Sequence, residues 1–307
     1  MKTSKNKNFF SVVIPTYNML SFLKKAINSV LKQSYKNYEI IIIDNHSSDG
    51  TEKYIQSLKN DKIKFFKIKN NGIIGKSRNL GIKKSKGNWI AFLDADDEWL
   101  SKKLKDINNF IKKKKFQVIC SSELIIDKIQ EKKKIWHYGP YEKNFYEILL
   151  RYGNKLSTSS SIVNKKFLEK FKINFSEKAS FANFEDYDFF LNISRKQGVF
   201  FFSKTIHGKH LFHEDSSTLK RKKLKNAFFS VIKHHVKIQR FTKNKDKLFN
   251  EISLIYEIKN LLKNIYYKKK VFFSSIKITI LFLINPLIFF KLLKNIVKNQ
   301  KNLIRIN

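Results

Sequence analysis

The 307-residue sequence is poor in cysteine, proline and glycine, with 1, 3 and 9 of them. The lone Cys120 excludes an intrachain disulfide and a metal site built from several thiolates. So little proline and glycine leaves no segment with the composition of a flexible linker, and no internal repeat is visible. No apolar run follows the basic start at residues 1–5, so we expect no secretory signal. These absences favour a reducing, cytoplasmic setting.

Acidic residues are scarce as well, since 25 Asp and Glu face 63 Lys and Arg, for a net charge of +38. Residues 216–307 hold 22 basic and 3 acidic residues, whereas residues 1–215 hold 41 and 22. The excess is explained either by an anionic partner, membrane or nucleic acid, or by a compositional bias toward Lys, Asn, Ile and Phe. We expect the bias throughout the chain and an anionic partner for the tail.

A long uncharged apolar run is also missing. The most apolar stretch, residues 271–293, is interrupted by two lysines, an asparagine and a proline, and its uncharged part, 278–290, has 13 residues. A membrane-spanning helix needs about 20. The flanking lysines, 268–270 among them, predict a segment that lies in the membrane interface or re-enters it, attracted by anionic lipid. The alternative is an ordinary amphipathic helix that covers the core.

Residues 9–98 alternate between two patterns. Short runs that are apolar on both faces predict strands at 10–14, 39–44, 63–68 and 88–94. Apolar residues spaced three and four apart predict helices at 20–31, 49–58 and 74–85, the second with Asp49 as its N-cap and Glu52 completing a capping box. Strand–helix alternation predicts parallel pairing in a doubly wound α/β sheet.

Beyond residue 99 the pattern becomes α+β. It predicts helices at 100–112, 142–151 and 184–195, strands at 116–121 and 157–163, two strand-like pieces within 199–212, and a run of basic helices over 216–307. We therefore expect one domain over residues 1–218, with halves at 8–100 and 101–218, and a basic helical extension over 219–307.

Polar loops follow three of the predicted strands, at residues 15–18, 44–50 and 94–97. Ligands of a doubly wound sheet bind at this edge, where the carboxyl ends of the strands meet. Asp94, Asp96 and Asp97 concentrate negative charge there, which a hard divalent cation together with phosphate oxygens would compensate. A solvated acidic turn is the alternative.

Other segments carry weaker signals. Residues 70–81 form a Gly-punctuated loop running into a helix that holds Arg78, which suits either a diphosphate or simple helix capping. The order is not that of a Walker loop or a dinucleotide fingerprint, which disfavours an ATPase or a dehydrogenase. Glu185 and Asp186 open a helix, where one acid acts as an N-cap or as a general base. His213, at a strand end, is a surface residue or a late metal ligand.

The order and spacing of four segments are informative: 11–18 (SVVIPTYN), 41–51 (IIIDNHSSDGT), 78–81 (RNLG) and 92–97 (FLDADD). They resemble family 2 glycosyltransferases of GT-A fold, in particular those that build bacterial surface polysaccharides such as O-antigen, capsule and lipooligosaccharide. The resemblance is strong over residues 9–100 and continues more weakly to about 218. There, Glu185-Asp186 takes the place of the family's acidic base motif, and residues 213–217 resemble its late His-x-x-Ser segment.

The resemblance implies a GT-A fold, with a Rossmann-like nucleotide-binding half and an acceptor-binding half, and a set of site residues. Asp186 would be the catalytic base, and Asp96 and His213 would hold Mn²⁺ or Mg²⁺. Pro15, Thr16, Tyr17 and Asp44 would hold the base and ribose, Arg78 the base or diphosphate, Asp94 the ribose, with Ala95 and Asp96 completing the nucleotide-sugar site. The sequence departs from the family pattern at two places. Asn45 stands where the family often has a second Asp after Asp44, and Leu211-Phe212 stand where it often has Tyr-Arg before the late His.

The implied reaction is metal-dependent and inverting. A hexose would pass from a nucleotide sugar, expected to be a UDP-hexose, to a saccharide acceptor on a polyprenyl diphosphate or a lipid A core, at the inner face of the cell membrane. A basic nucleic-acid-binding protein and a nucleotidyltransferase on a similar fold are the alternatives. Lysine dominates over arginine and the aromatics lie mostly in apolar runs, so we expect no nucleic-acid partner. Glu185-Asp186 argues against the nucleotidyltransferase.

Overall fold

The computed structural model describes residues 8–214, 221–266, 271–300 and 303–306. Its first part confirms the predicted alternation: β1 (Phe10–Thr16), α1 (Leu20–Leu31), β2 (Tyr38–Asp44), α2 (Thr51–Ser57), β3 (Ile63–Lys67), α3 (Ile74–Lys84) and β4 (Trp89–Phe92). Every residue of β1, β2 and β4 is buried, as strands covered on both faces require.

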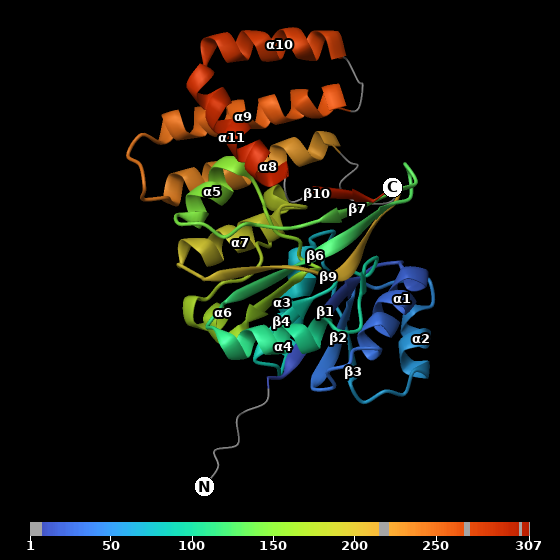
Figure 1. Ribbon diagram of the computed structural model, residues 1–307. Helices are drawn as coiled ribbons and strands as arrows, with labels where there is room; N and C mark the ends of the chain where they lie inside the picture. The colour runs from blue at the N-terminus through green and yellow to red at the C-terminus, as the bar shows by residue number, and fades with distance from the viewer. Residues whose placement is uncertain (1–7, 215–220, 267–270, 301–302, 307) are drawn as a thin grey trace.

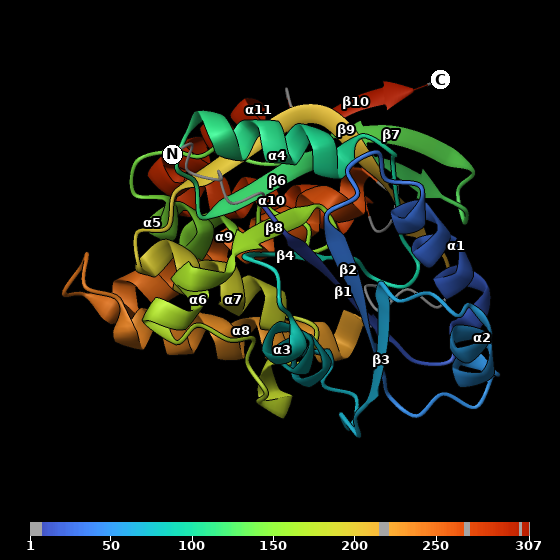
Figure 2. The same ribbon diagram turned by 90° about the horizontal axis from the view of Figure 1, so that it is seen from below.

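One sheet runs through the molecule. β3, β2, β1 and β4 lie side by side and pair in parallel, which confirms the doubly wound half. Antiparallel pairing then continues through β8 (Ser161–Asn164), β6 (Val118–Asp127), β7 (Lys132–Trp136) and β10 (Leu303–Ile306). Figure 2 shows α1 and α2 on one side of β1–β3 and α3 on the other.

The second part of the sheet differs from the expectation in three places. The two pieces predicted within 199–212 are one strand, β9 (Phe200–Phe212), which pairs with β6 and with the short β5 (Glu98–Trp99). Its register against β6 shifts twice between Ser203 and Gly208, and this irregularity interrupts the pattern in the sequence. β7 and β10 were not predicted, because β7 opens with three lysines and β10 is only four residues long.

The core lies on both faces of the sheet because side chains alternate along each strand. Val12 and Ile14 of β1 belong to the cluster that also holds Leu23 of α1, whereas Val13 belongs to the opposite cluster with residues such as Phe189. The remaining helices of this region are α4 (Lys103–Lys113), α5 (Phe145–Tyr152), α6 (Lys165–Phe171), the 3-10 turn η1 (Ala179–Phe181) and α7 (Glu185–Arg195).

Asp49 serves two helices rather than one. Its carboxylate accepts the backbone N–H of Leu20 at 2.8 Å and that of Thr51 at 3.2 Å, so it holds the starts of α1 and α2 together. The predicted capping box is wrong, because the Glu52 side chain turns instead to the ammonium of Lys67 on β3.

The C-terminal helices divide into two pairs. α8 (Arg221–Ile238) and α9 (Lys245–Tyr266) bury apolar side chains, Val231 and Ile252 among them, in the main core beside α7. The bent pair α10 (Val271–Ile284) and α11 (Pro286–Gln300) packs on α9 at the end of the molecule, as Figure 1 shows. Within the described residues no single helix has the length and apolarity of a membrane span, although 272–284 and 286–295, bent by 115°, meet that test jointly.

Candidate active site

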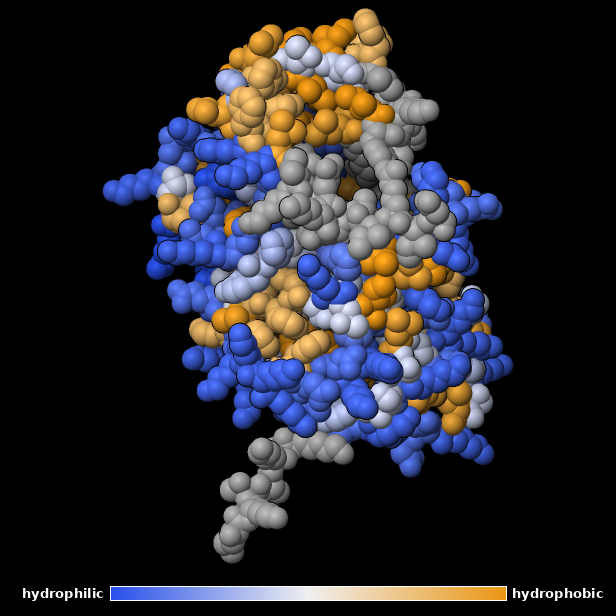
Figure 3. Space-filling model, viewed as in Figure 1, coloured by the Kyte–Doolittle hydropathy of each residue, from blue (hydrophilic) through white to orange (hydrophobic). Residues whose placement is uncertain are grey.

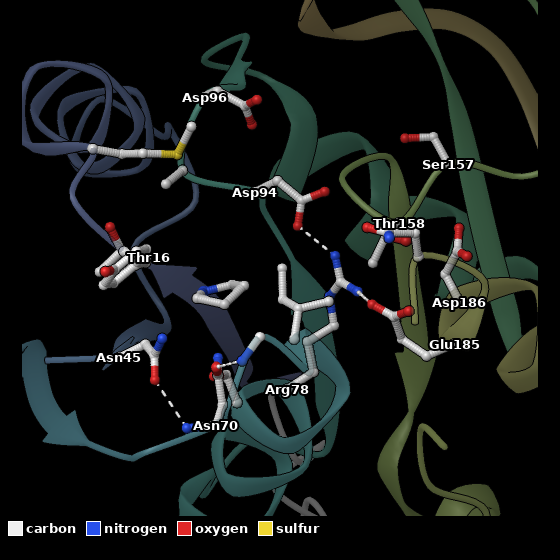
Figure 4. Close-up of a pocket in the computed structure, with 18 of the residues that line it drawn as sticks. Thr16, Asn45, Asn70, Arg78, Asp94, Asp96, Ser157, Thr158, Glu185 and Asp186 are labelled. Atoms are coloured by element: carbon white, nitrogen blue, oxygen red, sulfur yellow. Dashed lines mark hydrogen bonds and ion pairs between the residues drawn. The ribbon is translucent and has the colours of Figure 1, made fainter. Parts of the chain in front are cut away.

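A cavity of about 550 Å³ opens where β1, β2 and β4 end, at the sheet edge predicted to bind a ligand (Figure 4). Its wall consists of Pro15, Thr16, Tyr17, Met19, Asn45, Asn70, Gly72, Ile74, Ser77, Arg78, Asp94, Ala95, Asp96, Tyr138, Leu156, Ser157, Thr158, Asn183, Glu185, Asp186 and His210. The first thirteen come from the nucleotide-binding half predicted from sequence, and the rest from the second half.

Most of the predicted site residues meet here. Pro15, Thr16, Tyr17, Arg78, Asp94, Ala95, Asp96 and Asp186 all line the cavity. His213 is not in the lining, but its Nε2 lies 3.2 Å from Asp96 Oδ2 and its ring stacks on Phe22 at 4.8 Å. Asp44 is fully buried outside the lining, where its carboxylate accepts the N–H and the hydroxyl of Ser47. Its predicted contact with the base or ribose stays a prediction.

Arg78 joins the two halves of the cavity. One guanidinium nitrogen lies 2.7 Å from Asp94 Oδ1 and the other 3.3 Å from Glu185 Oε1 (Figure 4). The guanidinium also lies over the Phe175 ring, 5.3 Å from its centre. Burial acts to lower the pKa of Arg78, but the two carboxylates outweigh it and raise that pKa. The guanidinium therefore orients both acids, and its predicted contact with a ligand stays a prediction.

Glu185 and Asp186 face the cavity from the first turn of α7. Burial raises the pKa of Glu185 to about 7 against the opposing charge of Arg78, and Oε2 has no partner among the described residues. Burial also raises the pKa of Asp186, whose carboxylate accepts the Tyr187 N–H at 2.7 Å and the Asn154 amide at 3.3 Å. A carboxylate with a raised pKa is the better proton acceptor, as a general base requires.

His210 was missed by the sequence reasoning. It lines the cavity from β9 and its Nδ1 lies 3.1 Å from Asp97 Oδ2, while the Leu211 N–H donates to the other carboxylate oxygen. Burial raises the pKa of Asp97 to about 6, and the Asp97 carboxylate in turn overcomes the effect of burial on His210 and raises its pKa to about 10. The ion pair fixes β9 against the acidic turn.

The acidic turn is also held from the opposite loop. The Asp94 N–H donates to Ser159 Oγ at 3.0 Å. The Ser159 carbonyl accepts the indole N–H of Trp99 at 2.9 Å and the buried ammonium of Lys103 at 3.1 Å. Burial lowers the pKa of Lys103 to about 8, and the ammonium sits over the Trp99 ring.

The donor set fits a divalent cation. Burial and the charge of Asp94 raise the pKa of Asp96, and this cost of holding two carboxylates together is what a cation relieves. The described residues contain no cluster of three or more candidate ligands. Two protein ligands, Asp96 and His213, completed by phosphate oxygens, match the way proteins hold Mg²⁺ or Mn²⁺ beside a nucleotide.

Comparison with solved structures defines the class of the fold. The chain superposes on Staphylococcus aureus TarS 1-349 in complex with UDP-GlcNAc with a TM-score of 0.62, at 22% identity over 80% of this chain and 71% of that one. The mannosyltransferase PcManGT from Pyrobaculum calidifontis, in complex with GDP-Man and Mn²⁺, gives 0.59 at 11% identity, over 84% and 72%. The architecture is the predicted GT-A fold.

Residues 11–171 match Glycosyl transferase family 2, and the chain belongs to this family. It is 33% identical over 188 residues, 61% of this chain and 70% of the relative, to the Escherichia coli UDP-Glc:alpha-D-GlcNAc-diphosphoundecaprenol beta-1,3-glucosyltransferase WfaP. An uncharacterized glycosyltransferase of Rickettsia conorii is 42% identical over 46% of this chain. The chain spans only 23% of that protein's length, and 16% of a similar one from Rickettsia bellii.

Proposed function

We propose that the chain is an inverting glycosyltransferase that moves a hexose from a UDP-sugar to a hydroxyl of a lipid-linked or oligosaccharide acceptor in surface polysaccharide synthesis. The proposal rests on two pairs of acidic residues that face each other across one cavity. Asp94 and Asp96 lie on one wall, and Glu185 and Asp186 lie on the other. The relative WfaP, named for transfer from UDP-Glc to a diphosphoundecaprenol-linked sugar, supports the substrate class.

In the proposed reaction, Asp186 accepts the proton of the acceptor hydroxyl. The hydroxyl oxygen forms a bond to the anomeric carbon as the bond from that carbon to the diphosphate oxygen breaks, and the nucleoside diphosphate leaves with the bonding pair. A single displacement inverts the configuration. The raised pKa of Asp186 supports its role, because proton transfer is most efficient when the base has a pKa nearer the working pH.

The nucleotide half of the cavity would hold the leaving group. Pro15, Thr16 and Tyr17 would flank the base and ribose, Asp94 would accept from the ribose hydroxyls, and Arg78 would keep Asp94 oriented through its 2.7 Å ion pair. Asp96 and His213 would hold Mn²⁺ or Mg²⁺. When bound, the cation supplies positive charge that stabilises the departing diphosphate.

We also propose that the enzyme works at an anionic membrane surface through α10 and α11. Phe272, Phe273 and Leu287 are 71%, 74% and 75% exposed, and Figure 3 shows the apolar surface that gathers at this end of the molecule. Soluble monomers rarely expose a contiguous apolar patch of this kind. Exposed Lys291 and Lys294 on the same pair of helices supply the attraction to anionic lipid. Within the extension expected over 219–307, the membrane contact is therefore proposed for α10 and α11, whereas α8 and α9 pack in the main core and β10 pairs with β7.

Calorimetric titration with UDP tests the catalytic proposal. We expect binding that requires Mn²⁺, disappears with EDTA, weakens in Asp96→Ala and persists in Asp186→Asn. GDP, CDP and a short DNA duplex serve as competitors. Salt-sensitive DNA binding with no nucleoside diphosphate signal would refute the proposal, as would release of pyrophosphate from a nucleoside triphosphate and a sugar phosphate.

Sedimentation with lipid vesicles tests the membrane proposal. Wild-type protein should bind phosphatidylglycerol vesicles more tightly than phosphatidylcholine vesicles. Replacing Phe272 and Phe273 by Ser should weaken partitioning at least about tenfold, since two large apolar side chains no longer leave water. The matched control replaces the exposed Ile129 and Trp136 by Ser. Equal loss in both variants would contradict the assignment to α10.

A further inference from the structure

One basic side chain of the cavity wall keeps a ring nitrogen that the protein does not use. The described residues that line the cavity include two basic side chains, Arg78 and His210. Both terminal nitrogens of the Arg78 guanidinium are engaged by carboxylates, those of Asp94 and Glu185. His210 uses only Nδ1, for Asp97, and its Nε2 has no protein partner in the part of the chain that the structure describes.

The His210 ring is oriented from behind by a buried acid. The Asp97 carboxylate accepts from Nδ1 of His210 at 3.1 Å and from the Leu211 backbone N–H at 3.1 Å, and the Asp97 N–H donates to the Asp94 carbonyl at 3.1 Å. A carboxylate only accepts, so Nδ1 carries a hydrogen and Nε2 is the nitrogen turned away from Asp97. The ring is therefore fixed before any ligand arrives.

The His210 ring also carries a positive charge at neutral pH. Burial alone would lower the pKa of His210, but the negative charges of Asp97, Glu123 and Asp96 outweigh burial and raise that pKa to about 10. Both nitrogens of a charged imidazole carry a hydrogen, so Nε2–H is a charged donor. Such a donor is suited to the oxygen of an anion.

Fastening β9 to the acidic turn does not account for the whole arrangement. The Asp97 side chain is 1% exposed, whereas that of His210 is 37% exposed, so the pair is buried at its acid and open at its imidazole. The Leu211 N–H already ties β9 to the same carboxylate. The open end of the ring is the part that a structural role leaves unexplained.

Resting on the proposed function, we propose that His210 is a phosphate-binding residue of the cavity, whose Nε2–H donates to an oxygen of a substrate diphosphate. Both proposed substrates carry this group, the nucleotide sugar and the lipid-linked acceptor. Hydrogen bonds between two charged partners are about twice as strong as those between neutral ones. His210 would supply positive charge from the chain itself, in addition to the cation proposed for Asp96 and His213.

His210→Gln tests the proposal and keeps a donor for Asp97, because the glutamine amide carries no charge but still has an NH₂ group. Calorimetry with Mn²⁺ present measures the affinity for UDP, and then, with UDP bound, for a geranyl diphosphate ester of GlcNAc, a short version of a lipid-linked acceptor. One of the two should bind at least about tenfold more weakly than to wild type, the scale of a hydrogen bond to a charged group. The compound that responds shows whether donor or acceptor supplies the phosphate.

A second measurement separates phosphate binding from support of the acidic turn. Mn²⁺ alone, followed by electron paramagnetic resonance of the free ion, should bind His210→Gln at least as tightly as wild type. The reason is that the variant removes a positive charge that acts on Asp96. A residue that merely supported the turn would give the opposite result, because its loss would disturb the carboxylates and weaken Mn²⁺ binding.

The matched control is Lys209→Gln, which removes a positive charge from the neighbouring residue of β9, outside the cavity wall. Each affinity should change less than about twofold in this variant, since solvent screens its charge. Thermal melting should show both variants folded.

Three results would count against these assignments. Equal diphosphate affinities in His210→Gln and Lys209→Gln would overturn the role of His210 and leave the proposed function standing. Weaker binding of Mn²⁺ alone by His210→Gln would likewise overturn that role. No binding of UDP to wild type, with Mn²⁺ present, would overturn the proposed function itself.

Discussion

His235 on α8 and Asp188 on α7 form a fully buried pair, with Nε2 and Oδ1 2.9 Å apart. The other ring nitrogen of His235 lies 3.1 Å from the Tyr146 hydroxyl on α5. Three helices therefore meet at one imidazole, and one of them presents Glu185 and Asp186 to the cavity. The C-terminal region is joined to α7 by a specific polar contact as well as by apolar packing.

His235→Ala should destabilise the protein by about 2–3 kcal/mol, because it removes the imidazole partner of a buried carboxylate and of a hydroxyl and opens a cavity. Urea unfolding followed by circular dichroism measures the change. Lys237→Ala, two residues away and exposed, is the control and should change the free energy of unfolding by less than about 0.5 kcal/mol. Equal losses would mean that the buried pair contributes nothing specific.

Gly81→Ala should also be destabilising, by about 1–3 kcal/mol. Gly81 of α3 packs against β1 so closely that an added Cβ would lie 2.2 Å from Val13 Cγ1. Val13→Ala removes the clashing methyl groups, so the double variant should lose less than the sum of the two single variants. Additive losses in the same urea assay would show that the close approach is not the cause.

Glu185 should make the free energy of unfolding fall as the pH rises, which is the opposite of the usual effect of an acidic residue. Its pKa rises from 4.5 to about 7 on folding, so the folded state binds more protons over that window. The contribution of Glu185 to the free energy of unfolding is fully present below pH 4.5 and is lost as the pH rises through about 7. As the pH rises from 4.5 to 7, the free energy of unfolding of Glu185→Gln should fall less than that of wild type. Identical pH profiles of the unfolding midpoint would contradict the raised pKa.

Asp186→Asn should lower kcat by a factor of about 10²–10⁴, the range that general-base catalysis supplies. UDP affinity should not change, because Asp186 lies across the cavity from Thr16 and Asn45 (Figure 4). A radiolabelled transfer assay measures the first and calorimetry the second. Asp61→Asn, an exposed acid outside the cavity wall, should keep wild-type turnover. Robust transfer by Asp186→Asn would assign the base elsewhere, with Glu185 the next candidate.

The sequence predicts residues 8–100 well because β1, β2 and β4 are buried on both faces and are therefore strongly apolar. Helix α1 has the predicted bounds, and β2 and α3 differ from the prediction by one residue each. The features that the sequence did not predict share a physical cause. β7 opens with lysines, two of them exposed. The Glu52 side chain pairs with Lys67 on β3, and β10 pairs with a strand more than 160 residues away in the chain. None of these contacts leaves a periodic pattern in its own segment.

The site was predictable where a motif sits next to a strand end, as for Asp94 and Asp96. His210 was not, because its partner Asp97 lies 113 residues away and nothing around His210 distinguishes it from the neighbouring strand residues. Asn45 was visible as a departure from the family's usual Asp. Its orientation depends on the Asn70 backbone, which no sequence pattern specifies.

Trp99 is a natural fluorescent reporter next to the candidate site. The indole is buried, shares the Ser159 carbonyl with Lys103, and stands beneath the turn whose Asp94 N–H is held by the same serine. We expect a ligand that contacts Asp94, which lines the cavity, to shift this serine and the polarity around the indole ring. Of the other two tryptophans, Trp89 lies at the opposite end of β4 and Trp136 on β7. Intrinsic fluorescence should therefore follow occupancy of the site in real time, without a label.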